Sequence, residues 1–121
     1  MRAWEAEDVG ALVALLREDA LLTMPPVPEW YRGREGIGGF MAAQWPALGP
    51  FRLLPARANG QPAFGLYGAG LAGGSSFRPL TLQVLRTEAG SIAEIVGFIE
   101  PSAFGYPGAD LFPRFGLPPA A

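Results

Sequence analysis

The sequence predicts an α+β fold in which N-terminal helices pack on a curved, mostly antiparallel sheet formed by the second half of the chain. The chain has 121 residues, 50% of them hydrophobic and 17% charged, which is enough apolar material for the core of one domain. Apolar residues recur at helical spacing in the first half. After residue 50 the pattern changes to short apolar runs separated by turn residues, as in strands. Helices that precede such a sheet and cover it define the α+β class.

Helical segments are expected from the first residue onward. Residues 1–7 read as the last turns of a truncated helix, with Trp4 as its large apolar residue. Asp8 is a candidate N-cap for the next helix, because an aspartate side chain can accept a hydrogen bond from the first turn. The apolar residues of that helix follow at i, i+3, i+4 and i+7 and predict an end near Asp19; they are Val9, Leu12, Val13 and Leu16.

A longer helix is predicted from residue 34 to about residue 48, where helical spacing returns. Gly36, Gly38 and Gly39 weaken such a helix by about 1 kcal/mol each relative to alanine, so we expect tertiary packing to hold it. Between the helices, residues 20–24 form a candidate strand ended by prolines. Residues 29–33 are expected to form a short irregular strand or a loop.

Four strands are predicted in the second half, at 51–58, 62–67, 77–87 and 91–100. Asn59-Gly60 is a strong hairpin signal and Ala89-Gly90 a weaker one. Pro55 and Pro79 lie inside strand-like runs, which indicates sheet edges or bulges. A strongly twisted sheet wrapped over helices would leave a conical cavity, where we expect a ligand.

The tail of the chain, residues 101–121, is rich in proline and glycine but is expected to pack on the domain. Its large apolar residues are too many for a free tail; they are Phe104, Tyr106, Leu111, Phe112, Phe115 and Leu117.

Composition excludes several classes of active site. The chain has no cysteine and no histidine, so disulfides, thiol nucleophiles, catalytic triads with histidine and the common zinc sites are absent. We find no phosphate loop, nucleotide fingerprint or metal-ligand cluster, and we expect no cofactor and no metal. The net charge is −2 and the nine basic residues, all arginine, are scattered, which argues against direct nucleic acid binding. With no membrane span and no signal peptide, the expected location is cytoplasmic.

Several local motifs, read together with the helix–strand order, resemble one family over most of the chain. The most specific are Trp30-Tyr-Arg-Gly-Arg34 and Arg57-Ala-Asn-Gly-Gln-Pro-Ala63. Further matching segments are residues 2–6, 8–19, 22–26, 82–85, 92–95 and 112–118. The chain resembles the SnoaL-like branch of the nuclear-transport-factor-like superfamily. More narrowly, it is similar to the C-terminal SnoaL-like domain of actinobacterial extracytoplasmic-function RNA polymerase sigma factors.

The resemblance implies a cone-shaped fold with a pocket inside it, dimerisation across the sheet, and regulation of sigma-factor core domains in a parent protein. Two departures bear on chemistry. SnoaL-type cyclases carry a motif like Ile-x-Glu-His-Trp-Asp on the last strand. Here the aligned run keeps Glu94 but puts Ile95 at the histidine and Gly97 at the aspartate. In the sigma-factor relatives a histidine usually precedes the Leu-Gln-Val-Leu run, where this chain has Pro79-Leu-Thr81.

Candidate ligand-binding residues combine polar groups expected to converge in the cone with apolar lining. They are Trp30, Tyr31, Arg57, Asn59, Gln61, Gln83, Met24, Phe40, Phe64 and Phe98. Each has a structural alternative. Asn59 can serve only the turn with Gly60, the amide of Gln83 can have a structural partner, and the apolar residues can be plain core.

Weak catalytic candidates are Glu94, Glu100 and Arg57. The two glutamates share a face of the last strand with Ile92, Val96 and Phe98, provided that no bulge shifts the register. A carboxylate desolvated there would have a raised pKa and could act as a base, whereas solvation on the convex face would leave it inert. Arg57 beside one of them would make a structural ion pair.

Two functions follow from these observations. The first is a regulatory domain that binds a small apolar or aromatic ligand without chemistry, with a homodimer formed across the outer face of the sheet. The second is a stand-alone enzyme of the polyketide cyclase, ketosteroid isomerase or epoxide hydrolase type, which would use a pocket carboxylate.

Overall fold

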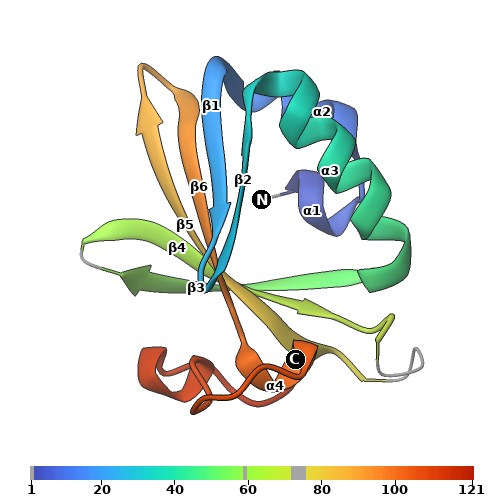
Figure 1. Ribbon diagram of the computed structural model, residues 1–121. Helices are drawn as coiled ribbons and strands as arrows, with labels where there is room; N and C mark the ends of the chain where they lie inside the picture. The colour runs from blue at the N-terminus through green and yellow to red at the C-terminus, as the bar shows by residue number, and fades with distance from the viewer. Residues whose placement is uncertain (1, 59, 72–75) are drawn as a thin grey trace.

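The computed structural model describes residues 2–58, 60–71 and 76–121 (Figure 1). Four helices are α1 (Arg2–Glu5), α2 (Val9–Leu15), α3 (Gly33–Leu48) and α4 (Pro101–Phe104), and a 3-10 turn, η1, spans Phe112–Phe115. Six strands are β1 (Leu16–Met24), β2 (Val27–Arg32), β3 (Phe51–Ala58), β4 (Gln61–Gly68), β5 (Arg78–Glu88) and β6 (Ser91–Ile99). No helix within the described ranges is long and apolar enough to cross a membrane.

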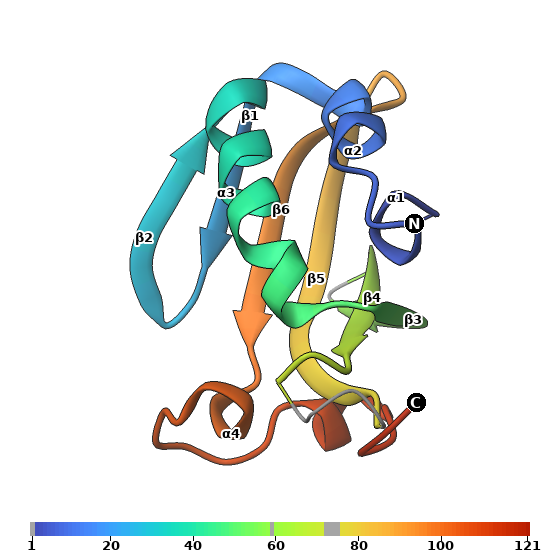
Figure 2. The same cartoon turned by 90° about the vertical axis from the view of Figure 1, so that its right-hand side faces the viewer.

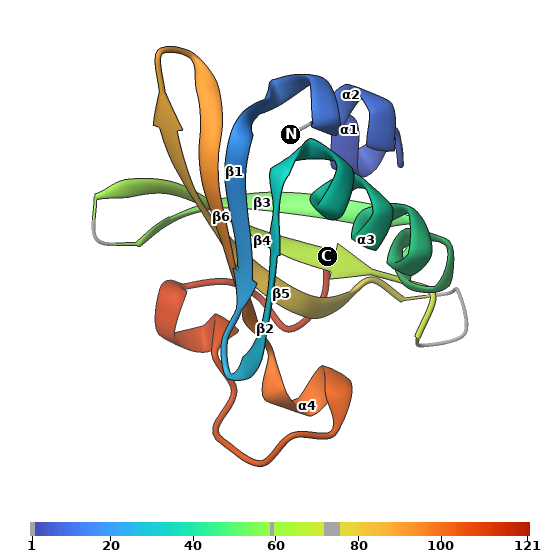
Figure 3. The ribbon, with the colours of Figure 1, turned by 45° about the horizontal axis from the view of Figure 1, so that its top comes forward.

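The strands form one sheet in the order β2-β1-β6-β5-β4-β3. Every neighbouring pair is antiparallel except β1 and β6, which run parallel. The sheet twists so strongly that β3 and β4 run across the direction of β1 and β2 (Figure 1). Helices α1, α2 and α3 lie together on the concave side (Figure 3), and α3 crosses in front of β5 and β6 (Figure 2). The result is the α+β cone that the sequence predicts.

The second helix begins as predicted but ends earlier. Asp8 is its N-cap, and its carboxylate accepts a hydrogen bond from the Ala11 backbone N–H at 3.0 Å. The predicted end near Asp19 is wrong, because the backbone becomes extended at Leu16. Leu16 pairs with Ile92 of β6, and its carbonyl accepts a hydrogen bond from Arg34 at 3.0 Å. Strand β1 therefore starts four residues earlier than expected, and Leu16 is buried as a strand residue.

The long helix α3 and the later strands match their predicted ranges to within one residue at most ends. Tertiary packing supports α3 despite its glycines. Ile37, Met41 and Trp45 are buried along its inner side, and a Cβ at Gly38 would lie 2.9 Å from Cγ2 of Val13, so the glycine lets α2 and α3 approach closely. Residues 29–33, for which the sequence allows a short strand or a loop, lie mostly in strand β2.

The turn and proline signals have structural counterparts. Ala89 and Gly90 both have positive φ, 51° and 83°, and join β5 to β6. Pro55 lies on the edge strand β3, and Pro79 lies where the register of β4 and β5 shifts, as predicted for an edge and a bulge. Asn59, the first residue of the other turn signal, lies outside the described residues.

The sheet separates two apolar clusters. The cluster on the concave side contains Trp4, which is fully buried, together with residues of α2, α3 and five strands. The cluster on the opposite side joins β3, β4 and β5 to the tail through Tyr67, Leu82, Phe112 and Leu117. Phe112 and Leu117 of the tail are buried in this second cluster.

Glu100 anchors the tail from the end of β6. This residue is only 2% exposed, and its carboxylate accepts hydrogen bonds from the backbone N–H groups of Leu111 and Phe112 at 2.9 Å. A carboxylate that accepts backbone hydrogen bonds in a buried setting makes a stronger interaction than a neutral acceptor. Tyr67 adds a second anchor, because its hydroxyl donates to the Pro118 carbonyl at 2.7 Å.

We expect Glu100→Gln to lower the free energy of unfolding by about 1–3 kcal/mol. The amide keeps one acceptor oxygen but turns an NH2 group toward two backbone donors. Urea unfolding followed by circular dichroism measures the change. Glu35→Gln, at an exposed position of α3, is the control and should change stability by less than about 0.5 kcal/mol. Equal stability of the two variants would contradict the anchoring role.

A second prediction concerns alkaline pH. Burial raises the pKa of Tyr67 from 10.0 to about 12. The folded state therefore holds the phenol proton more tightly than the unfolded state, and this contribution to stability is present below pH 10 and lost between pH 10 and about 12. Tyr67→Phe should flatten the loss of stability over that interval, measured by urea unfolding at each pH. Tyr106→Phe, at an exposed tail position, should leave the loss unchanged.

Candidate functional site

A cavity of about 210 Å³ lies between α3 and the concave face of the sheet. We call it the cone cavity. Its lining residues come from both halves of the chain and are Trp4, Leu22, Met24, Phe40, Met41, Gln44, Trp45, Leu48, Phe51, Leu66, Leu80, Thr81, Gln83, Ile99 and Phe104. None of them carries a charge at neutral pH. An apolar cavity with a few polar groups is the usual form of a small-molecule site.

Aromatic rings fix the inner wall of the cone cavity. Trp4 packs edge-on against Phe64, with ring centroids 5.1 Å apart, and lies 6.2 Å from Trp45. Trp45 in turn packs edge-on against Phe51 at 5.6 Å. These tilted and edge-to-face contacts hold the rings in place, so the wall is preformed.

Besides the exposed Gln44, three residues of the lining have polar side-chain atoms: Trp4, Thr81 and Gln83. Gln83 is 5% exposed, and its Nε2 donates a hydrogen bond to Thr81 Oγ1 at 2.7 Å. The amide Oε1 of Gln83 and the indole Nε1 of Trp4 are buried without a partner among the described residues. Buried polar groups are nearly always hydrogen-bonded in folded proteins, so these two are the polar atoms of the lining that a bound ligand or water would have to satisfy.

Gly97 stands on β6 at the position that the resemblance aligns with the cyclase aspartate. It pairs with Gln83 across β5 and β6, and a Cβ at Gly97 would lie 3.2 Å from the Gln83 Nε2. The amide of Gln83 therefore lies against the bare backbone at the position that the resemblance aligns with the cyclase aspartate.

The two candidate catalytic glutamates are held elsewhere. A register shift in β6, opposite Arg86 and Thr87, separates Ile92 from the face that Glu94 shares with Val96 and Phe98. Glu94 lies on the outer face, where its Oε1 is 3.3 Å from Arg86 Nε. Glu100 is buried but both of its oxygens hold the tail. Ile92 therefore does not share the face of Glu94, Val96 and Phe98, an arrangement expected only if no bulge intervened.

Of the predicted ligand-binding residues, Met24, Phe40 and Gln83 line the cone cavity. Phe64 is fully buried behind the wall, in contact with Trp4. Tyr31 stacks on Phe40 with centroids 4.4 Å apart. The Tyr31 hydroxyl donates to Glu29 at 2.8 Å, and this hydrogen bond is the main reason that the pKa of Tyr31 is raised.

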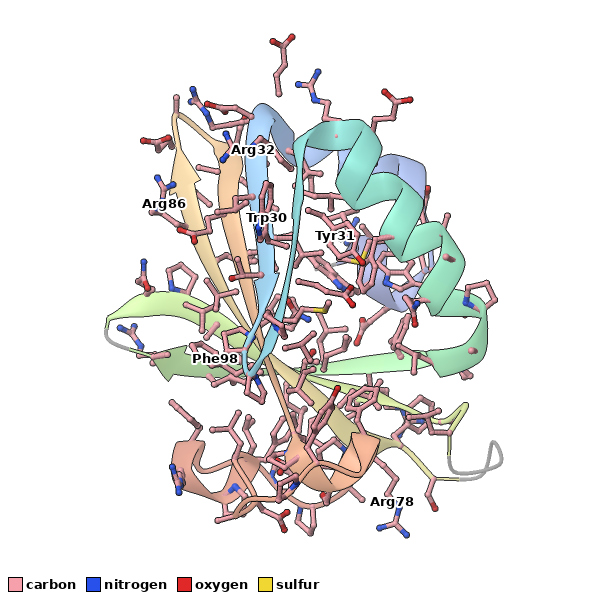
Figure 4. All side chains as sticks on the ribbon, viewed as in Figure 1. Trp30, Tyr31, Arg32, Arg78, Arg86 and Phe98 are labelled. Atoms are coloured by element: carbon pink, nitrogen blue, oxygen red, sulfur yellow. The ribbon has the colours of Figure 1, made fainter. Side chains whose placement is uncertain are left out.

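The remaining predicted residues lie away from the cone cavity. Trp30 is 59% exposed on the side of β2 opposite Tyr31 (Figure 4), and Phe98 is 36% exposed on the same outer face. Arg57 and Gln61 border a separate open depression at the β3–β4 hairpin, and Arg57 forms no ion pair with any described residue. Asn59 is outside the described residues.

Sequence reasoning missed most of the wall. In the sequence, Trp4 stands out only as a large apolar residue on a short helical segment. Nothing in the sequence pattern marks Thr81 as part of a cavity. Trp45 and Met41 share the helical spacing of α3, which marks a buried side but does not separate core from cavity lining. A second depression, between β5 and the tail, holds about 360 Å³ and is bordered by two carboxylates, the exposed Asp110 and the buried Glu100, of which Glu100 already accepts hydrogen bonds from the tail.

Comparison with known proteins agrees with this fold. The profile of the SnoaL-like domain family matches residues 1–95. The sigma factor SigG of Mycobacterium tuberculosis, an extracytoplasmic-function RNA polymerase sigma factor, is 36% identical over 118 residues. That match covers 96% of this chain but 29% of SigG, so the chain spans less than a third of the length of this curated relative.

Solved structures show the same fold at low identity. A candidate SnoaL-like polyketide cyclase from Shewanella putrefaciens superposes with a TM-score of 0.67 at 13% identity, over 87% of this chain and 77% of the other. An NTF-2 like protein of unknown function from Burkholderia xenovorans gives a TM-score of 0.64 at 16% identity, over 93% and 82%. From the family match, the sigma-factor relative and the cone fold together, the chain belongs to the SnoaL-like domain family of NTF2-like proteins.

Proposed function

We propose that residues 1–121 form one regulatory domain that binds a small molecule in the cone cavity, in the setting of an extracytoplasmic-function sigma factor in the cytoplasm. The observation that carries the proposal is the apolar cavity with unpartnered polar atoms on Gln83 and Trp4 and no carboxylate in its lining. Such a site can hold a ligand but offers no group to move a proton. The similarity to SigG supports the sigma-factor setting.

A short series of contacts connects the cone cavity to the tail. Phe104 of α4 belongs to the lining, and Leu80 borders both the cone cavity and the depression beneath the tail. The Leu80 carbonyl accepts a hydrogen bond from the Glu100 N–H at 2.8 Å, and the Glu100 carboxylate holds residues 111 and 112. A ligand that displaces Phe104 or Leu80 would therefore act on the anchor of the tail, whose outer surface is available to sigma-factor core domains.

The alternative is an enzyme of the cyclase, isomerase or epoxide hydrolase type. Names of some structural neighbours favour it, but those neighbours share the fold alone. It needs a carboxylate at the substrate, and Glu94 and Glu100 are engaged outside the cone cavity. Turnover of a ketosteroid or an epoxide by the pure protein, abolished by Glu94→Gln or Glu100→Gln with folding retained, would favour the enzyme and overturn the binding domain.

A homodimer across the outer face is the second part of the proposal. The outer face is the uncovered side of β2, β1 and β6, where Trp30, Thr23 and Val96 are cross-strand neighbours and Phe98 lies one pair further along β6. The tail packs against the outer side of β3, β4 and β5, and Val96 of β6 lies at the border between the tail's apolar cluster and the outer face. Charges of both signs lie on this face. Arg32 lies 5.7 Å from the Trp30 ring, and Arg86 pairs with Glu94. A two-fold interface brings the same patch of both subunits together, so a patch with both signs of charge can complement itself.

Binding can be followed through the methionines, because the chain has only three and two of them, Met24 and Met41, line the cone cavity. With 13C-methyl methionine labelling, toluene should shift these two signals. Gln44→Trp, at the exposed rim of the cavity, should weaken binding at least about tenfold by blocking entry. Ala43→Trp is the matched control, because Ala43 precedes Gln44 on α3, is exposed, and lies outside the lining. Unshifted Met24 and Met41 signals would refute the proposed function.

The dimer prediction is tested by light scattering on eluted fractions. The wild-type chain at micromolar concentration should show twice the mass of one 12.8 kDa chain. Trp30→Glu and Phe98→Glu should each return it to a single chain, since both place a charge in an apolar interface. Tyr106→Glu introduces the same charge at an exposed tail position and should leave the dimer intact. A wild-type mass of one chain would rule out this interface.

A further inference from the structure

We infer that the cone cavity selects a neutral, single-ring ligand that bears both a hydrogen-bond acceptor and a hydrogen-bond donor, such as a ring carboxamide or lactam. This inference rests on the proposed function and narrows it to a ligand class. Three properties of the cavity carry it, namely its volume, the absence of charge in its lining, and the pair of open polar atoms on Trp4 and Gln83.

The volume limits the ligand to about one ring. The cavity holds about 210 Å³. In another protein an engineered apolar cavity of about 150 Å³ binds benzene, and pockets for drug-sized ligands start at about 300 Å³. One six-membered ring with a polar substituent therefore fits, whereas a four-ring steroid or an extended polyketide exceeds the space.

The lining excludes a charged ligand. Its fifteen residues include no Asp, Glu, Lys or Arg, and the chain has no histidine. Moving an ion out of water into such a site carries a large unfavourable free energy unless a counter-charge or several hydrogen bonds meet it. A carboxylate ligand would also face the Oε1 of Gln83, which repels negative charge. Neutral compounds are therefore favoured.

The two open polar atoms define what the neutral ligand must carry. The indole N–H of Trp4 can only donate, so the ligand needs an acceptor, and the amide oxygen of Gln83 can only accept, so the ligand needs a donor. The Thr81 hydroxyl fixes the orientation of the amide by accepting from Nε2 at 2.7 Å. Trp4 packs on Phe64, and Phe64 pairs with Gln83 across β4 and β5, so Phe64 is a neighbour of both residues that carry these groups.

Three compounds of the same ring size separate these properties: toluene, benzamide and benzoate. Benzamide has a carbonyl for Trp4 and an NH2 group for Gln83, toluene has neither, and benzoate carries a charge. We expect benzamide to bind at least about tenfold more tightly than either of the others, from one or two added hydrogen bonds at a dry site. Titration with the Met24 and Met41 methyl signals measures all three dissociation constants.

Two further readouts tie the preference to the named atoms. The chain has three tryptophans, so its indole N–H groups give three resolvable signals. Benzamide should move the Trp4 indole signal downfield, as expected for a new hydrogen bond, while toluene should not. Gln83→Leu should reduce the preference for benzamide over toluene at least about fivefold. Gln61→Leu, an amide on β4 outside the cone cavity, is the matched control and should preserve the preference.

The outcomes distinguish this inference from the proposed function. Toluene binding as tightly as benzamide, or a preference unchanged in Gln83→Leu, would overturn the ligand class and leave the binding domain intact. Tighter binding of benzoate would overturn the neutral-ligand argument. Absence of any shift at Met24 and Met41 with all three compounds would overturn both the inference and the proposed function, with water then filling the cavity.

Discussion

The parallel pairing of β1 with β6 is the contact on which the cone depends. The C-terminal meander from β3 to β6 is local in sequence, and so is the β1–β2 hairpin. The pairing of residues 16–23 with 92–96 joins them into one sheet, and the Ile99 N–H adds a hydrogen bond to the Pro25 carbonyl. Because β1 enters beside the last strand, β2 becomes the far edge, and α3 must cross the concave face to reach β3. The concave core and its cavity lie under that crossing helix.

Sheet curvature then decides which side chains reach the cavity. Register shifts occur in β1, β4 and β6, and each turns the strand relative to its neighbour. In β6 the shift sends Glu94 outward and brings Ile95, Gly97 and Ile99 inward. At Gly97 the missing side chain leaves space that the Gln83 amide occupies. The polar groups in the lining near this position are the Gln83 amide, the Thr81 hydroxyl and the Trp4 indole.

The tail divides the opposite side of the sheet into two regions. Glu100 holds residues 111 and 112, and Tyr67 holds Pro118, so the tail covers β3, β4 and β5. The outer face of β2, β1 and β6 stays open, with Trp30 as its most exposed large apolar side chain. Leu80 borders both the cone cavity and the depression beneath the tail, and Glu100, whose N–H donates to the Leu80 carbonyl, holds the tail.

Short-range patterns in the sequence determined the elements of this protein: the Asp8 cap, the helix from 34 to 48, the four later strands and the Ala89-Gly90 turn. These depend on residues within one turn or one hairpin of each other. The end of α2 and the site were decided by tertiary structure. Leu16 fits the apolar face of a helix and the buried face of a strand equally well. It adopts the strand conformation because it pairs with Ile92 of β6. Which residues line the cavity depends on the bulges in the strands and on the way α3 crosses the sheet. These features place Trp4 and Gln83 in one lining although nearly eighty positions separate them in the chain.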